Sequence, residues 1–375
     1  MSLRSSFLNT VIIITYMADF TQTIENIEKE IRETPYHKGT EHHIGILRAR
    51  LARIKDKIIE SGIHLRQGSG GQGGGYAVKK TGDVSVVLVG PPSSGKSTLL
   101  NKLTNAESKV AEYPFTTTSV IPGMMFYQDA YIQIFDIPGL IEGASHGKGR
   151  GKEVLSVARN SDLIIILSDI QRANQIEKIL AELEKAGIRI NKKRPKVLIN
   201  KKPVGGITIH SNIRQDLGEK TIKEIASEMG IKNADISLRE KVTIDSLIDA
   251  FSTSRVYLPA IFVINKIDIN YQPLAINYLG ISAEKGIALD NLKDEIWKKL
   301  ELVRVYLVHP DEEPNLENPM IMKKGEILRD VALKIGTDFA EDKKFAKIWG
   351  VGAHFPGQEV SLTTKVLEGM HVRFL

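Results

Sequence analysis

Short apolar runs separated by amphipathic segments dominate the middle of the chain. Four of these runs predict buried strands, at Val84–Val89, Tyr131–Phe135, Leu163–Leu167 and Ala260–Ile264. Runs that are apolar at nearly every position are typical of parallel strands, because helices cover both faces of such a sheet. The pattern therefore predicts an α/β fold with a doubly wound, parallel sheet in this region.

A different pattern precedes these strands. From Phe20 to Ile59, apolar residues recur at every third or fourth position. This spacing predicts two amphipathic helices, and Thr34-Pro35 interrupts the pattern so that they form a helical hairpin. Gly68 to Gly75 follows and contains six glycines in eight positions. Such a run is too costly in backbone entropy for a helix or strand, so we expect a flexible joint or loop.

The interval between the third and fourth apolar runs is much longer than one crossover helix requires. We interpret about Ile190 to Ser254 as an inserted α+β subdomain with a helix near Ile222–Met229. After Leu300 the pattern changes to short strands and turns. Strands are expected at Val303–Val308, Phe345–Trp349 and Val372–Leu375, with a helix at Ile327–Lys334. About 75 residues are enough for a separate small α+β domain at this end.

Composition narrows the classes of function. The chain of 375 residues is 42% hydrophobic and has no cysteine, which excludes disulfides, thiolate metal sites and cysteine nucleophiles. The absence of cysteine is consistent with a reducing compartment, and we expect a cytoplasmic protein. A formal net charge of +6 favours phosphate-rich partners such as RNA through long-range attraction.

The apolar stretch Phe7–Met17 is the only candidate for a membrane segment. A spanning helix needs roughly 20 apolar residues, so this stretch is too short and we expect no membrane partner. It continues into Met17-Ala18-Asp19, which resembles a second start site. We therefore interpret residues 1–16 as an extension of the protein.

The segment Gly90 to Ser97 matches the phosphate-loop motif G-x-x-x-x-G-K-[ST], and it lies between an apolar strand and a predicted helix. In such loops backbone N–H groups surround the β-phosphate, the lysine neutralises β- and γ-phosphate oxygens, and the serine hydroxyl holds Mg²⁺. We expect Lys96 to contribute to catalysis as well as to binding. The nucleotide-binding residues predicted here are Gly90, Ser93, Ser94, Gly95, Lys96, Ser97 and Thr98.

Two further elements predict the metal site and the switch segments. Asp136-Ile137-Pro138-Gly139 ends the second apolar run, so the Asp136 carboxylate can hold Mg²⁺ and the Gly139 amide can contact the γ-phosphate. Thr116, Thr117 and Thr118 lie between the phosphate loop and this strand. One of their hydroxyls can join the metal when a γ-phosphate is present. Each of these signals is weak when taken alone.

Asn265-Lys266-Ile267-Asp268 follows the fourth apolar run and selects the base. A carboxylate at Asp268 can accept hydrogen bonds from both N1–H and the amine of guanine, whereas adenine would leave it facing a lone pair. Ser282-Ala283 fits the last loop, where a backbone amide covers the base. The predicted base-binding residues are Asn265, Lys266, Asp268, Ser282 and Ala283. Because all five elements occur in order, the chain is expected to bind GTP and GDP and to hydrolyse GTP.

At this level of detail the chain resembles the Obg-like P-loop GTPases, and within them the developmentally regulated GTP-binding protein family, over nearly its whole length. The matching segments are the glycine run followed by Ala77 to Asp83, then Tyr113 to Thr117, Gly147 to Gly151, Lys201 to Gly206, Asn233 to Asp235, and Arg255 to Tyr257. The resemblance implies an N-terminal helical region, a GTPase domain with an insertion, and a C-terminal TGS domain of β-grasp shape.

Together with the patterns above, the resemblance implies boundaries for these parts of the chain. We expect the helical region at 17–67, the glycine-rich joint at 68–82, the GTPase domain at 83–300 with its insertion at about 190–254, and the TGS domain at 302–375. The resemblance further implies a translation-linked role with ribosome or RNA contact, and a small regulatory protein partner.

The resemblance also implies roles for individual residues. Thr117 resembles the metal-sensing switch threonine, with Thr116 as the alternative. The implied catalytic set is thus Lys96, Thr117 and Gly139, and the implied metal ligands are Ser97, Thr117 and Asp136. Leu140 lies where Ras-like enzymes place the glutamine that orients the attacking water, so we expect slow intrinsic hydrolysis.

The residue that orients the attacking water is left open. His146 and Arg150, in the second switch, are candidates for polar help, and they can equally be solvated loop residues. Ser93 lies where potassium-assisted relatives often have asparagine, which leaves a K⁺ requirement open.

An alternative of a different class is a nucleotide-gated module for RNA or ribosome binding in which hydrolysis is incidental. The densest basic cluster would be its contact surface, and a solvated charged face is an equally good interpretation of the same residues. This basic cluster consists of Lys192, Lys193, Arg194, Lys196, Lys201 and Lys202. A metabolic kinase or ATPase on the same fold is disfavoured by the guanine-selective Asn265 to Asp268.

Overall fold

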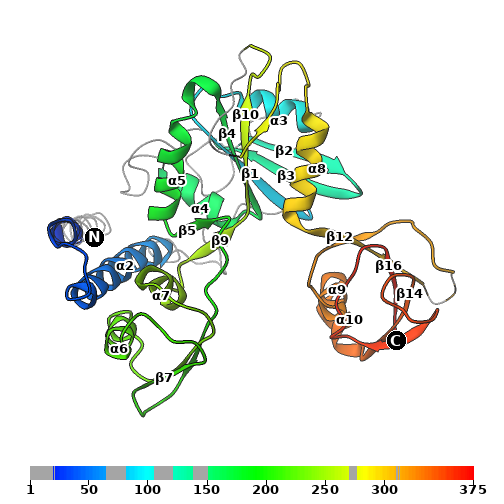
Figure 1. The fold of residues 1–375 in the computed structure, drawn as a ribbon. Coiled ribbons are helices and arrows are strands. Elements are labelled where there is room, and N and C mark those ends of the chain that lie inside the picture. The colour runs from blue at the N-terminus through cyan, green and yellow to red at the C-terminus, as the bar shows by residue number, and fades with distance from the viewer. Residues whose placement is uncertain are drawn as a thin grey trace, which may run out of the picture. The chain divides into compact units, whose positions relative to one another are not determined.

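The computed structural model describes residues 20, 22–64, 82–104, 121–137, 151–269, 277–309, 311 and 313–375 (Figure 1). The chain divides into two compact units. One unit combines the N-terminal segment up to Gly75 with Lys192–Tyr257, and the other combines Tyr76–Asn191 with Leu258–Leu375. Among the described residues, no helix is both long and apolar enough to cross a membrane.

The second unit contains a six-stranded sheet with the strand order β11-β10-β4-β1-β3-β2. Its strands are β1 Val84–Val89, β2 Ile121–Tyr127, β3 Ala130–Asp136, β4 Leu163–Asp169, β10 Ala260–Asn265 and β11 Leu279–Gly280. Every residue of β1 and β4 is buried, as expected for central strands that helices cover on both faces. The four predicted strands are therefore confirmed as β1, β3, β4 and β10.

The sheet departs from the parallel arrangement at one edge. Strand β2 pairs antiparallel with β3, whereas the other neighbouring strands are parallel. The turn between β2 and β3 consists of Gln128 and Asp129, which both have positive φ angles, of 48° and 66°. Two such residues in succession are typical of the tight hairpin turns that match strand twist, and Gln-Asp lacks the glycine that usually reveals them.

Helices pack on both faces of this sheet (Figure 1). They are α3 Lys96–Thr104, α4 Gly151–Asn160, α5 Gln175–Lys185 and α8 Leu289–Leu300, with a short strand β5 at Ile188–Ile190. Leucines of α3 and α8 share one hydrophobic cluster with Val86 and Leu88 of β1. This packing fixes the start of α3 next to the carboxyl end of β1, where the phosphate loop lies.

A five-stranded sheet with the order β13-β12-β16-β14-β15 follows in the same unit. Its elements are β12 Leu302–Leu307, β13 Met320–Lys323, α9 Leu328–Ile335, α10 Thr337–Asp342, β14 Phe345–Trp349, β15 Gln358–Ser361 and β16 Met370–Phe374. The first and last strands are parallel neighbours at the centre, and α9 packs on one face. Lysines of this part pair with carboxylates beside β1 and β4: Lys323 with Asp162 at 2.7 Å, and Lys334 with Asp83 at 3.0 Å.

The other unit combines the N-terminal helices with the insertion. A helix at residues 22–33 ends before Pro35, and α2 Glu41–His64 follows, which confirms the predicted pair of helices. The insertion contains β6 Val197–Lys201, β7 Ile207–Ser211, α6 Glu219–Glu228, β8 Ala234–Leu238 and α7 Ile244–Phe251, and the short strand β9 Val256–Leu258 follows it in the sequence. Ala49 and Ala52 of α2 are buried in one cluster with Ile225 of α6 and Leu247 of α7.

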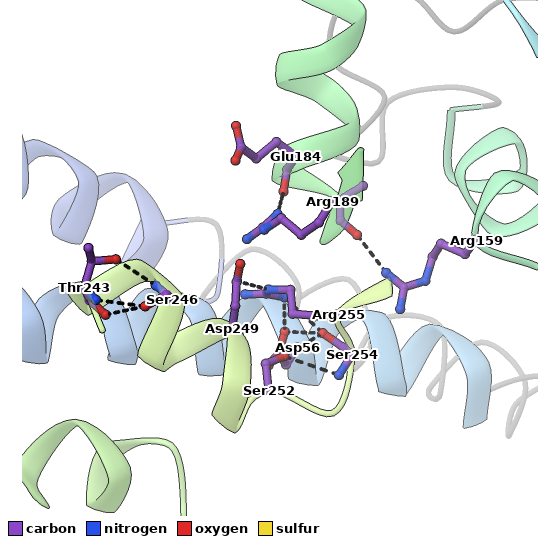
Figure 2. A network of polar contacts seen from close by, with 11 residues as sticks. Asp56, Arg159, Glu184, Arg189, Thr243, Ser246, Asp249, Ser252, Ser254 and Arg255 are labelled. Atoms are coloured by element: carbon purple, nitrogen blue, oxygen red, sulfur yellow. Dashed lines mark hydrogen bonds and ion pairs between the residues drawn. The ribbon is translucent and has the colours of Figure 1, made fainter. Parts of the chain in front are cut away.

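A buried charge network holds α2 to the end of α7 (Figure 2). Asp56, whose residue surface is 7% exposed, accepts a hydrogen bond of 2.8 Å from Arg255 Nη1. It also accepts hydrogen bonds from the hydroxyls of Ser252, at 2.6 Å, and Ser254. Arg255 Nε donates to Asp249 Oδ1 at 2.9 Å, so one guanidinium pairs with both carboxylates. Because the charges are paired and hydrogen-bonded, their burial is tolerated.

We predict that Arg255→Met destabilises the unit that contains α2 by about 3–5 kcal/mol, because both carboxylates then lose their buried countercharge. Urea unfolding followed by far-UV circular dichroism measures the change. Arg48→Met is the matched control, because it removes the exposed ion pair with Asp245 from the same two helices. The control should cost about 1 kcal/mol or less. Equal losses in the two variants would contradict a special role for the buried network.

Candidate functional site

The phosphate loop begins where β1 ends, at the carboxyl edge of the six-stranded sheet. Ser93 and Gly95 both have positive φ angles, of 59° and 95°. A Cβ at Gly95 would lie 2.2 Å from Asn265 Nδ2, and one at Gly90 would lie 2.0 Å from the carbonyl oxygen of Leu167. The two motif glycines are therefore required by close packing as well as by conformation.

The Lys96 side chain lies buried against the loop that precedes it. Its Nζ donates to the carbonyl oxygens of Gly90, at 3.1 Å, and Pro91, at 2.9 Å. Burial lowers the pKa of Lys96, and the nearby carboxylate of Asp136 partly offsets this effect. Among the described residues, no carboxylate pairs directly with this buried ammonium group, so it is well suited to bind an incoming phosphate.

Ser97 and Asp136 bring two oxygen ligands together. Ser97 Oγ donates to Asp136 Oδ2 at 2.5 Å. The other carboxylate oxygen, Oδ1, is buried and has no hydrogen-bond partner among the described residues. A hydroxyl beside an unpartnered carboxylate oxygen is a set of hard oxygen donors, which fits Mg²⁺. The third predicted ligand, Thr117, lies outside the described residues, as do Thr116, Thr118, Gly139, Leu140, His146 and Arg150.

Asn265, at the end of β10, connects the phosphate loop to the predicted base-covering loop at Ser282-Ala283, the base loop. Its Nδ2 donates to the carbonyl oxygen of Ser94 at 2.9 Å, and its Oδ1 accepts from the backbone N–H of Ala283 at 2.9 Å. The side chain is buried, so neither group can exchange its partner for bulk water. The next residue, Lys266, donates from Nζ to the carbonyl oxygen of Ser93 at 2.9 Å.

Asp268 lies in the same group of loops, beside Ser282 and Lys285. A hydrogen bond from the Ser282 side chain holds the pKa of Asp268 below its ordinary value, and Lys285, with Nζ 3.2 Å from Asp268 Oδ2, contributes in the same direction. The carboxylate is therefore ionised at neutral pH and can accept two hydrogen bonds from one base edge. Thr98 is exposed on the first turn of α3, and Ser94 is buried under the loop.

Two residues at this edge were missed by the sequence analysis. Asp169, at the end of β4, is buried and accepts a hydrogen bond from the backbone N–H of Arg172 at 3.0 Å. Arg172 Nη1 donates to the carbonyl oxygen of Pro92 at 2.6 Å, so this pair supports the phosphate loop from the neighbouring strand. The signal that could have revealed it is an aspartate at the end of an apolar strand, as at Asp136.

Comparison with protein-family models divides the chain into three matches. Residues 85–202 match the model described as 50S ribosome-binding GTPase, residues 204–302 match the model for the C-terminal region of that domain, and residues 303–375 match the TGS domain.

Curated relatives match over most of the chain. Developmentally-regulated G-protein 3 of Arabidopsis thaliana is 42% identical over 92% of this chain and 95% of its own length. Developmentally-regulated GTP-binding protein 1 of Xenopus laevis is 40% identical over 90% of this chain and 94% of its own. An uncharacterized GTP-binding protein of Methanocaldococcus jannaschii is 41% identical, with coverage of 93% and 90%.

We predict that Asn265→Asp weakens GDP binding at least tenfold, which is about 1.4 kcal/mol. The new carboxylate oxygen would face the carbonyl oxygen of Ser94 instead of donating to it, so the phosphate loop would lose its contact with the base loop. Calorimetric titration with GDP measures the effect. Asn291→Asp, on the exposed surface of α8, adds the same charge as a control. Unchanged affinity in Asn265→Asp would mean that this amide does not organise the site.

Proposed function

Because the chain belongs to the developmentally regulated GTP-binding protein family, we propose that it is a GTP-driven switch that acts on the ribosome or on RNA. The family establishes the chemistry: the protein is a GTPase, which binds GTP and GDP and converts GTP and water to GDP and phosphate. The observation that carries the proposal for the site is the Asn265 amide, because it couples the phosphate loop to the loops that would read guanine.

In the proposed mechanism the chain's own groups bind and orient the nucleotide. Backbone N–H groups from Gly90 to Ser97 surround the β-phosphate, and Lys96 turns from its two carbonyl partners to the β- and γ-phosphate oxygens. Ser97 and Asp136 would hold Mg²⁺, the usual metal of such enzymes, and the metal would neutralise charge on the transferred phosphoryl group. Asp268 accepts the two hydrogen bonds of guanine, and the backbone at Ser282-Ala283 covers the base.

The switch itself is assigned to segments that the sequence identifies. Thr117, or Thr116 in its place, would join the metal in the GTP state, and the Gly139 amide would contact the γ-phosphate. Leu140 offers no polar group to the attacking water, so the water must be oriented by another residue, a partner or a cation such as K⁺ near Ser93. Intrinsic hydrolysis is therefore slow, and a bound helper sets the rate.

The proposed ribosome or RNA contact is supported by two independent observations. The family model that matches residues 85–202 is described as a ribosome-binding GTPase. In the basic cluster, all members except Lys202 have exposed side chains. The sixth, Lys202, donates to Asp235 Oδ1 at 2.7 Å, so its charge is already engaged within the sheet and it contributes less to phosphate contact.

The remaining elements of the proposal follow from this role. We place the protein in the cytoplasm with the ribosome, and we expect a small regulatory protein as a further partner. We propose the same domain boundaries as above. The GTPase domain spans 83–300 and carries the insertion at about 190–254. The helical region and the joint precede it and end at residue 82, and the TGS domain follows at 302–375.

The base-reading role of Asp268 gives the first prediction of this function. Asp268→Asn should shift preference from GTP to xanthosine triphosphate, because an amide can donate to the 2-oxo group that replaces the amine of guanine. Competition binding with both nucleotides measures the ratio of dissociation constants, which should change at least a hundredfold. Asp290→Asn, an exposed carboxylate of α8, is the control that keeps the GTP preference. A retained preference for GTP in Asp268→Asn would remove this residue from base recognition.

The dependence on a helper gives the second prediction. Single-turnover GTP hydrolysis by the purified protein should be slow, and ribosomes should raise it at least tenfold because they order the switch segments. Parallel assays in Na⁺ and K⁺ test whether a monovalent cation supplies part of the effect. Rapid hydrolysis by the protein alone in both salts would contradict the helper, and no stimulation by ribosomes would contradict the proposed target.

A further inference from the structure

A cavity of about 750 Å³ lies within the unit that contains α2 and the insertion. It is lined by side chains of α2, by β6, and by the ends of α6 and α7, and all of its lining residues belong to this unit. Small-molecule sites typically occupy about 300–1,000 Å³, so the cavity can hold a group of nucleotide size. None of the residues assigned to GTP takes part in it.

The lining carries an excess of positive charge. Arg53, Lys57, Arg194 and Lys201 line the cavity, and among the described residues Asp56 is the only acidic one in the lining. The Asp56 carboxylate pairs with Arg255 and accepts hydrogen bonds from two serine hydroxyls, as Figure 2 shows, which reduces its repulsion of an anion in the cavity. Lys57 of α2 and Lys201 of β6 are both exposed, so the lining has accessible cations on two different elements. Such an arrangement selects an anion with more than one negative oxygen.

The same cavity also offers flat and apolar surface. Ile199, Met229 and Phe251 form part of its wall. The guanidinium of Arg194 lies 5.5 Å from the centroid of the Tyr257 ring, which restrains the orientation of this planar group. Planar guanidinium groups stack on nucleic-acid bases, and apolar side chains cover the faces of a base. A simple inorganic anion would use the charges and leave this surface unoccupied.

We propose that this cavity binds one phosphorylated nucleotide unit, either within single-stranded RNA or as a free nucleotide. Lys57 and Lys201 contact the phosphate, and the base lies between Arg194 and the apolar wall. The inference deepens the proposed RNA contact. It rests in part on that proposal, because Arg194 and Lys201 belong to both the basic cluster and the cavity lining. Lys57 comes from α2 and lies outside that cluster.

The test uses the full chain with GDP saturating the GTP site, and two fluorescent probes, a single-stranded RNA oligonucleotide and AMP. Lys57→Glu combined with Lys201→Glu should weaken RNA binding at least tenfold. The slope of log affinity against log salt should fall by about 0.7, because the two lysines contact one phosphate and each contacted single-stranded phosphate contributes about 0.7. AMP binding that is lost in the same variant would identify the free nucleotide as a ligand.

The matched control is Lys220→Glu combined with Lys223→Glu, which reverses two lysines of α6 that do not line the cavity. The control should change RNA affinity less than twofold, and all variants should keep the circular dichroism spectrum and the GDP affinity of the parent. The milder pair Lys57→Gln and Lys201→Gln should show a smaller loss in the same direction. Equal effects in the cavity and control variants would overturn the proposal.

A third variant separates this inference from the proposed function. Reversal of Lys192, Lys193 and Lys196 to glutamate changes the basic cluster without touching the cavity lining. If this variant loses RNA binding while the cavity pair retains it, the surface contact stands and the cavity proposal fails. If the cavity pair loses RNA or AMP binding while ribosomes fail to stimulate the unmodified protein, the cavity stands and the ribosome role fails.

Discussion

The amide side chain of Asn265 joins loops that are far apart in the sequence. It donates to the phosphate loop at Ser94 and accepts from the base loop at Ala283, and it is buried so that water cannot substitute for either partner. The space for this amide exists because position 95 is glycine. In the proposed function, the loops for phosphate and base recognition are thereby held at a fixed separation before a nucleotide enters. Preorganisation of this kind lowers the cost of ordering the loops on binding.

The parts of this site that could be predicted are those whose physical requirements leave a local trace in the sequence. Buried parallel strands need continuous apolar runs, which identified β1 and β4, and the phosphate loop needs glycines at fixed spacing. The hairpin at Gln128 and Asp129 left no such trace, because ordinary residues adopt its positive φ angles. The position of Asp169 at the end of an apolar run is a trace of this kind that was not used. The role of Lys202 depends on Asp235, which strand pairing brings close, so the linear pattern could not reveal it.

Only part of the positive charge of the chain is available to bind other molecules. The net charge of +6 suggests a uniformly attractive protein, yet several cations are committed to internal partners, as Arg255 is to Asp56 and Lys202 to Asp235. In the proposed function, the remaining basic side chains of the insertion and α2 make the contacts with phosphate. Affinity for nucleic acid should therefore depend on a few positions, and bulk isoelectric point is a poor guide to it.

The unit that contains α2 is built from two segments that lie far apart in the sequence, and this affects its folding during translation. Asp56 and Arg255 are separated by 199 positions, so α2 emerges from the translating ribosome long before its packing partners exist. Its apolar positions, such as Ile44 and Leu47, are buried in the finished protein but must stay exposed on the nascent chain during this interval. The helix α2 can therefore pack in its final position only after the insertion has been translated. Until then its apolar face needs protection from aggregation on the nascent chain.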